Sequence, residues 1–113
     1  MLQRPRRNRA TAAIRGMARE THLQVDHLIL PLFLVDGKGI KDEIHSLPGT
    51  FRWSLDLLLK EIGECMDLGL RNFILFPAVA ESLKDNTATY SYAPKNFYLK
   101  AALEIKKQFP ECT

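Results

Sequence analysis

The sequence is poor in cysteine and has no long apolar run. Its only two cysteines, Cys65 and Cys112, stand far apart in the 113 residues, which excludes a disulfide framework and the repeated cysteine spacing of a metal-binding module. No apolar run approaches the roughly 20 residues of a membrane span, and no apolar segment follows the N-terminal arginines as in a secretory signal. We therefore expect reduced thiols, no membrane partner and a cytoplasmic location.

Patterns for metal, phosphate or amine chemistry are also missing. The histidines His22, His27 and His45 never stand four residues apart on one helix and have no cysteine at ligand spacing, so no metal site is expected within the chain. The DGKG segment at 36–39 lacks the spacing of a phosphate-binding loop. All eight lysines are predicted in polar loops or on helix faces beside other charges, so none is expected to be an activated amine.

What is present is an ordinary globular composition, 46% hydrophobic and 26% charged, with an uneven charge distribution. The first 20 residues hold six arginines against Glu20 alone, a net +5, so the total of +3 leaves −2 for the rest. Such a basic arm can pack on a neighbouring subunit, target an organelle or bind nucleic acid. Ala13, Ile14 and Met17 share one face of a predicted short helix, and the arm has no lysine or aromatic residue, which favours packing.

The rest of the chain predicts strand, helix, strand, helix with parallel connectivity. The regular part of the first strand is expected at residues 32–35, after Pro31, which cannot donate a ladder hydrogen bond. A connector with a Pro48-Gly49 turn leads to a helix that begins after Ser54 and ends near Gly69. Residues 73–77 (FILFP) predict a buried parallel strand, and the last helix is stopped by Pro110.

The carboxyl end of the second strand is the candidate site, because folds of this kind place their chemistry at strand ends. Phe76 and the loop residues Lys84, Asp85, Asn86 and Tyr90 are in position to face a ligand there. The alternative is that Phe76 belongs to an apolar core and that Lys84-Asp85 is a solvated loop pair. Spacing alone leaves both interpretations open.

Six segments of the sequence resemble the N-terminal third of the porphobilinogen synthase family, also called 5-aminolaevulinate dehydratase. These are RPRRNRATAAIRGMARET, LILPLFLVDG, SLPG, RWSLDLLLKEIGECMDLGLRNFILFP, LKDNTATYSY and KQFPE. The resemblance implies a (β/α)8 TIM barrel with an arm that packs on a neighbouring subunit of a homo-oligomer, usually an octamer. It also implies condensation of two 5-aminolaevulinate molecules through two Schiff-base lysines, with active-site zinc in many members and magnesium or potassium in others.

Carried over to this chain, the resemblance implies an α/β fold: the arm plus the first two βα units of the barrel, truncated before strand 3. Residues 1–24 would be the basic arm, the oligomer contact, and residues 25–113 the start of the barrel. The Schiff-base lysines and the cysteine cluster would lie beyond residue 113. We therefore assign no catalytic residue and no metal ligand within this chain. Phe76 is the one substrate-binding residue implied, Lys84-Asp85 is expected to shape its loop, and Cys112 is not a metal ligand.

The resulting functional prediction is a porphobilinogen synthase, a lyase of tetrapyrrole (haem and chlorophyll) biosynthesis, with this chain inactive alone. Zinc or magnesium is expected in the parent enzyme and none on the chain itself. The expected partners are the substrate 5-aminolaevulinate and other copies of the chain, without nucleic acid or membrane. One alternative is a small βα module that binds nucleic acid through its arginine arm. Another is a different lyase barrel with the same opening units.

Overall fold

The computed structural model describes residues 6–113. The arm contains the 3-10 helix η1 (Arg7–Arg9) and the short helix α1 (Ala12–Met17). A second 3-10 helix, η2 (Val25–His27), leads from the arm to the sheet. The body follows in the order β1 (Leu30–Val35), β2 (Lys41–Glu43), β3 (Phe51–Trp53), α2 (Leu55–Asp67), β4 (Phe73–Ala78), η3 (Glu81–Leu83), η4 (Thr89–Tyr92) and α3 (Phe97–Gln108). No helix in this described part of the chain is long and apolar enough to cross a membrane.

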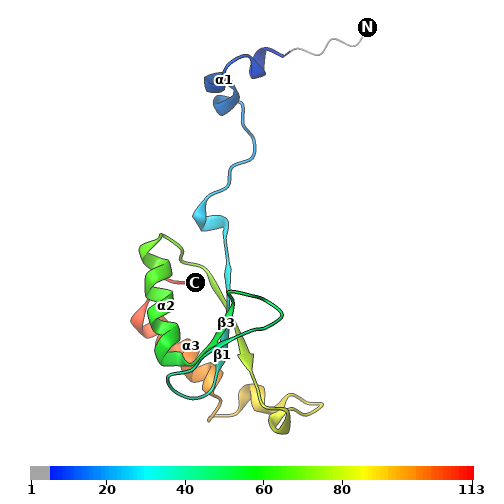
Figure 1. Ribbon diagram of the computed structural model, residues 1–113, viewed down its shortest axis with the longest axis vertical. Coiled ribbons are helices and arrows are strands. Elements are labelled where there is room, and N and C mark those ends of the chain that lie inside the picture. The colour runs from blue at the N-terminus through cyan, green and yellow to red at the C-terminus, as the bar shows by residue number, and fades with distance from the viewer. Residues whose placement is uncertain (1–5) are drawn as a thin grey trace.

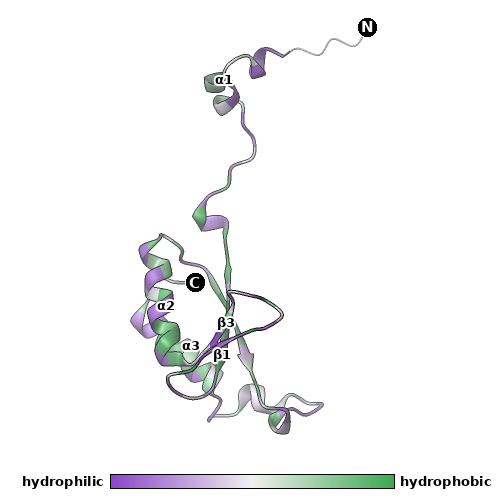
Figure 2. Ribbon diagram, in the orientation of Figure 1, coloured by the Kyte–Doolittle hydropathy of each residue, from purple (hydrophilic) through white to green (hydrophobic). Residues whose placement is uncertain are grey.

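The arm extends away from the body, and every residue from 6 to 29 is exposed (Figure 1). Helix α1 forms locally because the hydroxyl of Thr11 accepts a hydrogen bond from the backbone N–H of Ile14. In Figure 2 the hydrophilic colour is concentrated at η1, while α1 carries both kinds of residue. Apolar side chains such as Met17 and Leu23 are 88% and 80% exposed. Within the described part of the chain, these apolar side chains of the arm are therefore left uncovered.

The sheet has the strand order β2-β3-β1-β4. Strand β1 pairs in parallel with β4 along its whole length, with Phe33 opposite Phe76, and pairs in parallel with β3 at Phe33 and Leu34. The parallel connection that the sequence predicts is thus confirmed. The predicted connector contains the Pro48-Gly49 turn, and on either side of this turn it forms the antiparallel pair β2–β3, which the sequence did not predict. The sheet is therefore mixed.

Strand β1 begins at Leu30, so the expectation that the regular strand starts after Pro31 is wrong. The backbone N–H of Leu30 donates to the carbonyl of Asn72 next to β4. Since N–H groups alternate sides along a strand, the nitrogen of Pro31 points toward β3. Pairing between β1 and β3 begins only at Phe33, so no ladder hydrogen bond is lost at Pro31.

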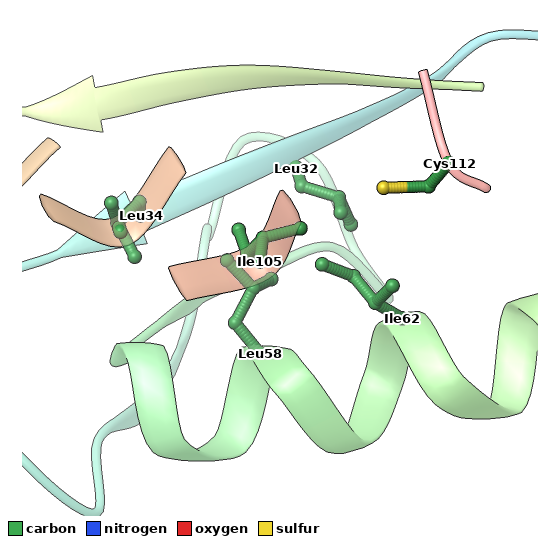
Figure 3. Packing of buried hydrophobic residues seen from close by; sticks show 7 residues of the cluster. Leu32, Leu34, Leu58, Ile62, Ile105 and Cys112 are labelled. Carbon is green, nitrogen blue, oxygen red and sulfur yellow. The ribbon is translucent and has the colours of Figure 1, made fainter. Parts of the chain in front are cut away.

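The core lies on one side of the sheet, where β1 meets helices α2 and α3 (Figures 1 and 3). Alternate residues of β1 turn toward the helices, as strand geometry requires. One face of α2 packs on this core, with Leu58 and Ile62 fully buried. On α3 the buried residues are Ala101 and Ile105. The buried cluster consists of Leu32, Leu34, Leu58, Ile62, Ala101, Ile105 and Cys112.

The two ends of helix α2 are stabilised in different ways. Gly69 follows the helix with φ of +91°, the left-handed conformation predicted for it. Ser54 stands at the predicted N-cap position, but its buried hydroxyl makes no capping hydrogen bond. It accepts instead from the backbone N–H of Ile40 and also bonds the carboxylate of Asp56. Both oxygens of Asp56 accept from the backbone N–H of Gly39 at 3.1 and 3.0 Å, which ties the β1–β2 turn to the helix.

Acid is expected to loosen this turn. The hydroxyl of Ser54 and then the N–H of Gly39 stabilise the charged carboxylate and hold the pKa of Asp56 below its usual value. The tether is therefore complete above the unfolded-state pKa of about 4 and is lost as the pH falls through the lower folded-state value. Amide exchange should show protection of Gly39 falling over this acid range. Asp56→Asn should remove that pH dependence, and the exposed Asp67→Asn should keep it; an unchanged profile in Asp56→Asn would refute the tether.

Candidate functional site

The sheet face opposite the helices carries an aromatic pair. Phe33 of β1 and Phe76 of β4 stack with ring centroids 5.7 Å apart and an interplanar angle of 26°. Phe76 is 46% exposed, and so is Ile74 two residues earlier on the same face. Helices α2 and α3 lie on the other side of the sheet (Figure 1). This face is therefore an apolar surface with Phe76 accessible near the carboxyl end of β4.

The other predicted site residues lie on the opposite side of β4. Pro77 follows Phe76 and faces the helix side, because successive strand residues alternate between faces. There a cavity of about 430 Å³ is lined by Pro77, Lys84, Asp85 and Tyr90, among others. The structure thus brings Lys84, Asp85 and Tyr90 together and separates them from Phe76. Asn86 is exposed and does not line this cavity.

Asp85 and Lys84 organise the loop, as the sequence predicts. The carboxylate of Asp85 accepts from the backbone N–H groups of Thr87 and Thr89 at 3.1 and 2.9 Å, and from the Thr87 hydroxyl. Hydrogen bonding from Thr89, then from Thr87, lowers the pKa of Asp85 and keeps it charged. Lys84 forms an ion pair with Glu81. Both side chains are engaged within the loop, which supports a structural role for the pair.

Ala88 holds the same loop in a strained conformation. Its φ of +52° and ψ of +37° lie in the left-handed region, which costs an alanine about 1–2 kcal/mol. Ala88→Gly is therefore expected to raise the free energy of unfolding by about 0.5–1 kcal/mol, after the greater chain entropy of glycine is subtracted. Urea unfolding measures the change. Ala93→Gly is the matched control, because Ala93 has φ of −66°; equal effects of the two substitutions would argue against strain at Ala88.

The cysteines and histidines do not converge on a metal site. No group of three His, Cys, Asp or Glu side chains suited to a metal ion occurs in residues 6–113. Both cysteines are free thiols, Cys65 half-buried on α2 and Cys112 in the core. Burial, then the carboxylates of Glu61 and Glu64, raises the pKa of the Cys65 thiol. The residues described here do not fit a zinc or magnesium ion.

Lys41 makes a contact with two aromatic rings that the sequence did not predict. Lys41 lies in strand β2 rather than in a loop, and its ammonium stands 4.4 Å from the ring centroid of Phe51 and 4.6 Å from that of Trp53. These are cation–π distances. Lys41 is therefore a packing residue of the hairpin. No sequence signal identifies this contact, because it depends on the β2–β3 register.

The parallel β1–β4 pair, helices on one face and an apolar opposite face define an α/β protein with a mixed sheet. The chain belongs to the delta-aminolevulinic acid dehydratase family, because the family model of that description matches residues 2–113. The resemblance found in the sequence motifs is confirmed.

Individual relatives agree with this assignment. The chain is 55% identical to the delta-aminolevulinic acid dehydratase of Chlamydia pneumoniae over 108 residues, 96% of this chain and 32% of that protein. It is 40% identical to that of Halalkalibacterium halodurans over 111 residues, 98% of this chain and 33% of that one. The Toxoplasma gondii ME49 delta-aminolevulinic acid dehydratase (porphobilinogen synthase), solved in complex with the reaction product porphobilinogen, superposes with a TM-score of 0.88. The match has 38% sequence identity and covers 99% of this chain and 32% of the Toxoplasma gondii chain. The chain spans about a third of the length of these relatives.

Proposed function

We propose that the chain provides the first third of a porphobilinogen synthase, a lyase that condenses two molecules of 5-aminolaevulinate into porphobilinogen in tetrapyrrole biosynthesis. The observation that carries this proposal is the family match, which spans the arm and the body together. The structural neighbour that holds porphobilinogen aligns with 99% of the chain. We also propose a cytoplasmic location, in keeping with the free thiols of Cys65 and Cys112.

The proposed architecture is an arm, residues 1–24, followed by the first two βα units of a (β/α)8 barrel, residues 25–113. Its structural support is the outer edge of β4. There the backbone N–H of Thr113 donates to the carbonyl of Arg71 and the N–H of Phe73 donates to the carbonyl of Thr113, both at 2.8 Å. This is the hydrogen-bond pattern of a parallel ladder. A polypeptide continuing past Thr113 along this edge would form the next parallel strand.

We assign Phe76 as a substrate contact of the complete enzyme. Its ring lies on the sheet face away from the helices and near the carboxyl end of β4, where barrel enzymes place their substrates. The neighbouring exposed side chain on that face, Ile74, is apolar and offers no group for proton transfer or imine formation. Phe76 would therefore supply an apolar wall. The Schiff-base lysines, and the zinc or magnesium of the whole enzyme, would come from outside residues 1–113.

We propose that the arm holds together a homo-oligomer, with an octamer as the expected assembly. Its exposed Met17 and Leu23 are apolar, and covering them with a protein surface stabilises the assembly. A nucleic-acid backbone would use the arginines and leave these side chains in water. The arm therefore suits a second copy of the chain better than a duplex.

A chimera tests the proposed function. Residues 1–113 would replace the aligned segment of the Chlamydia pneumoniae relative, which supplies the other two thirds. The chimera is expected to form porphobilinogen from 5-aminolaevulinate, detected as a pyrrole, and to give a borohydride-trapped adduct with the substrate. The 113-residue protein alone is expected to give neither. A trapped adduct on one of its own lysines, or an assembled chimera without activity, would overturn the proposal.

A further inference from the structure

We propose that Phe33 is a positioning residue for Phe76: it holds the ring of Phe76 in the orientation that meets the substrate. This inference rests on the proposed function, because it requires Phe76 to be a substrate contact. Phe33 itself would act through Phe76 and would make no direct contact with the reacting atoms.

The register places the two residues directly opposite each other in the parallel pair of β1 and β4. Opposite side chains of neighbouring strands stand about 5 Å apart at their Cβ atoms, close enough for ring-to-ring contact. The observed centroid distance of 5.7 Å and angle of 26° correspond to a stacked arrangement. Phe33 is half-buried whereas Phe76 is 46% exposed. One ring therefore supports the other, and the outer ring remains accessible.

The Phe76 ring has little support from the side chains of its own strand. Its neighbours along β4 on the same face, Ile74 and Ala78, are both exposed. These side chains are two residues away, so they flank the ring without facing it as Phe33 does. In the 113-residue protein, a phenylalanine that is 46% exposed would sample its rotamers more freely without Phe33. The stack with Phe33 thus fixes which face of the Phe76 ring points toward the proposed substrate.

Substitutions at Phe33 separate positioning from simple space filling. Phe33→Tyr keeps the ring and is expected to behave like the unsubstituted protein. Phe33→Leu keeps an apolar side chain of similar bulk but loses the stack. We expect Phe33→Leu and Phe33→Ala to raise the KM for 5-aminolaevulinate about two- to ten-fold, which corresponds to the interaction free energy of an aromatic pair. The kcat should stay unchanged within about two-fold, because these substitutions do not alter the lysine chemistry.

A double-mutant cycle in the chimera tests the mechanism. If Phe33 acts through Phe76, then Phe33→Ala raises KM in the chimera but causes no further rise when Phe76 is already alanine. Independent, multiplying effects would overturn the inference and leave the proposed function standing. No change in KM on Phe76→Ala would instead reject Phe76 as a substrate contact, and the positioning role with it. A rise in KM in Phe33→Tyr equal to that in Phe33→Leu would also overturn it.

A second measurement does not depend on activity. In the 113-residue protein with ring-labelled phenylalanine, the ring current of Phe33 should displace the Phe76 resonances from their free values. Phe33→Leu is expected to abolish this displacement and Phe33→Tyr to preserve it. Phe76 resonances that stay the same in Phe33→Leu would show that no ring holds Phe76 in place and would overturn the inference.

Discussion

Replacing Leu58 with alanine is expected to lower the free energy of unfolding by about 3–5 kcal/mol. Leu58 has no exposed surface and lies between β1 and α3, in the cluster that includes Leu34 and Ile105 (Figure 3). Removing the branched end of Leu58 leaves a cavity, and the surrounding helices and sheet can relax only partly to fill it. Urea unfolding of the 113-residue protein measures the loss.

The matched control for Leu58→Ala is Leu103→Ala. Leu103 is also a helical leucine, on α3, but is 72% exposed. Its substitution should change the free energy of unfolding by no more than about 0.5 kcal/mol. The conservative Leu58→Met should cost less than about 1.5 kcal/mol, because it preserves volume. Similar losses for Leu58→Ala and Leu103→Ala would contradict the placement of the core.

Removing residues 1–24 is expected to break the proposed oligomer into much smaller species. The arm residues that the structure describes, 6–24, are all exposed, so the rest of the described chain does not cover them. Their covering surface must then come from another copy if the arm has a packing role. Sedimentation velocity of the chimera with and without these residues measures the change. A chimera that keeps its full assembly without the arm would contradict the proposed oligomer contact.

Two arm variants separate apolar packing from charge. Met17→Ser with Leu23→Ser keeps all arginines and removes two large apolar side chains that are 88% and 80% exposed. Arg15→Gln with Arg19→Gln keeps the apolar residues and removes two charges. The serine variant is expected to weaken assembly more, and with little dependence on salt. A dominant, strongly salt-dependent effect of the glutamine variant would favour an electrostatic arm instead.

The local patterns predicted the long elements well because each has a clear period. The helical repeat through Leu58 and Ile62 gave α2, and the short apolar run at residues 73–77 gave β4. The hairpin was missed because β2 and β3 have only three residues each, too few to show an alternating pattern. The strand position of Pro31 depends on which side its nitrogen faces, and only the assembled sheet shows that.

The candidate site was only partly accessible from the sequence. Phe76 and the loop at residues 84–90 are close in sequence, yet strand alternation turns Phe76 away from the cavity that the loop lines. The alternation rule applied to Phe76 and Pro77 would have separated them. The stack of Phe76 on Phe33 could not have been found in this way, because it depends on the register of two strands 43 positions apart.

The two borders of the sheet have opposite characters. Strand β2, the outermost on one side, consists of Lys41, Asp42 and Glu43, and all three are exposed. A short strand of charged residues discourages the addition of a foreign strand. Strand β4, the outermost on the other side, is six residues long and apolar. An aggregate of unassembled chains should therefore spare the hairpin and grow from β4, along the part of its edge beyond the hydrogen bonds between Thr113 and Phe73.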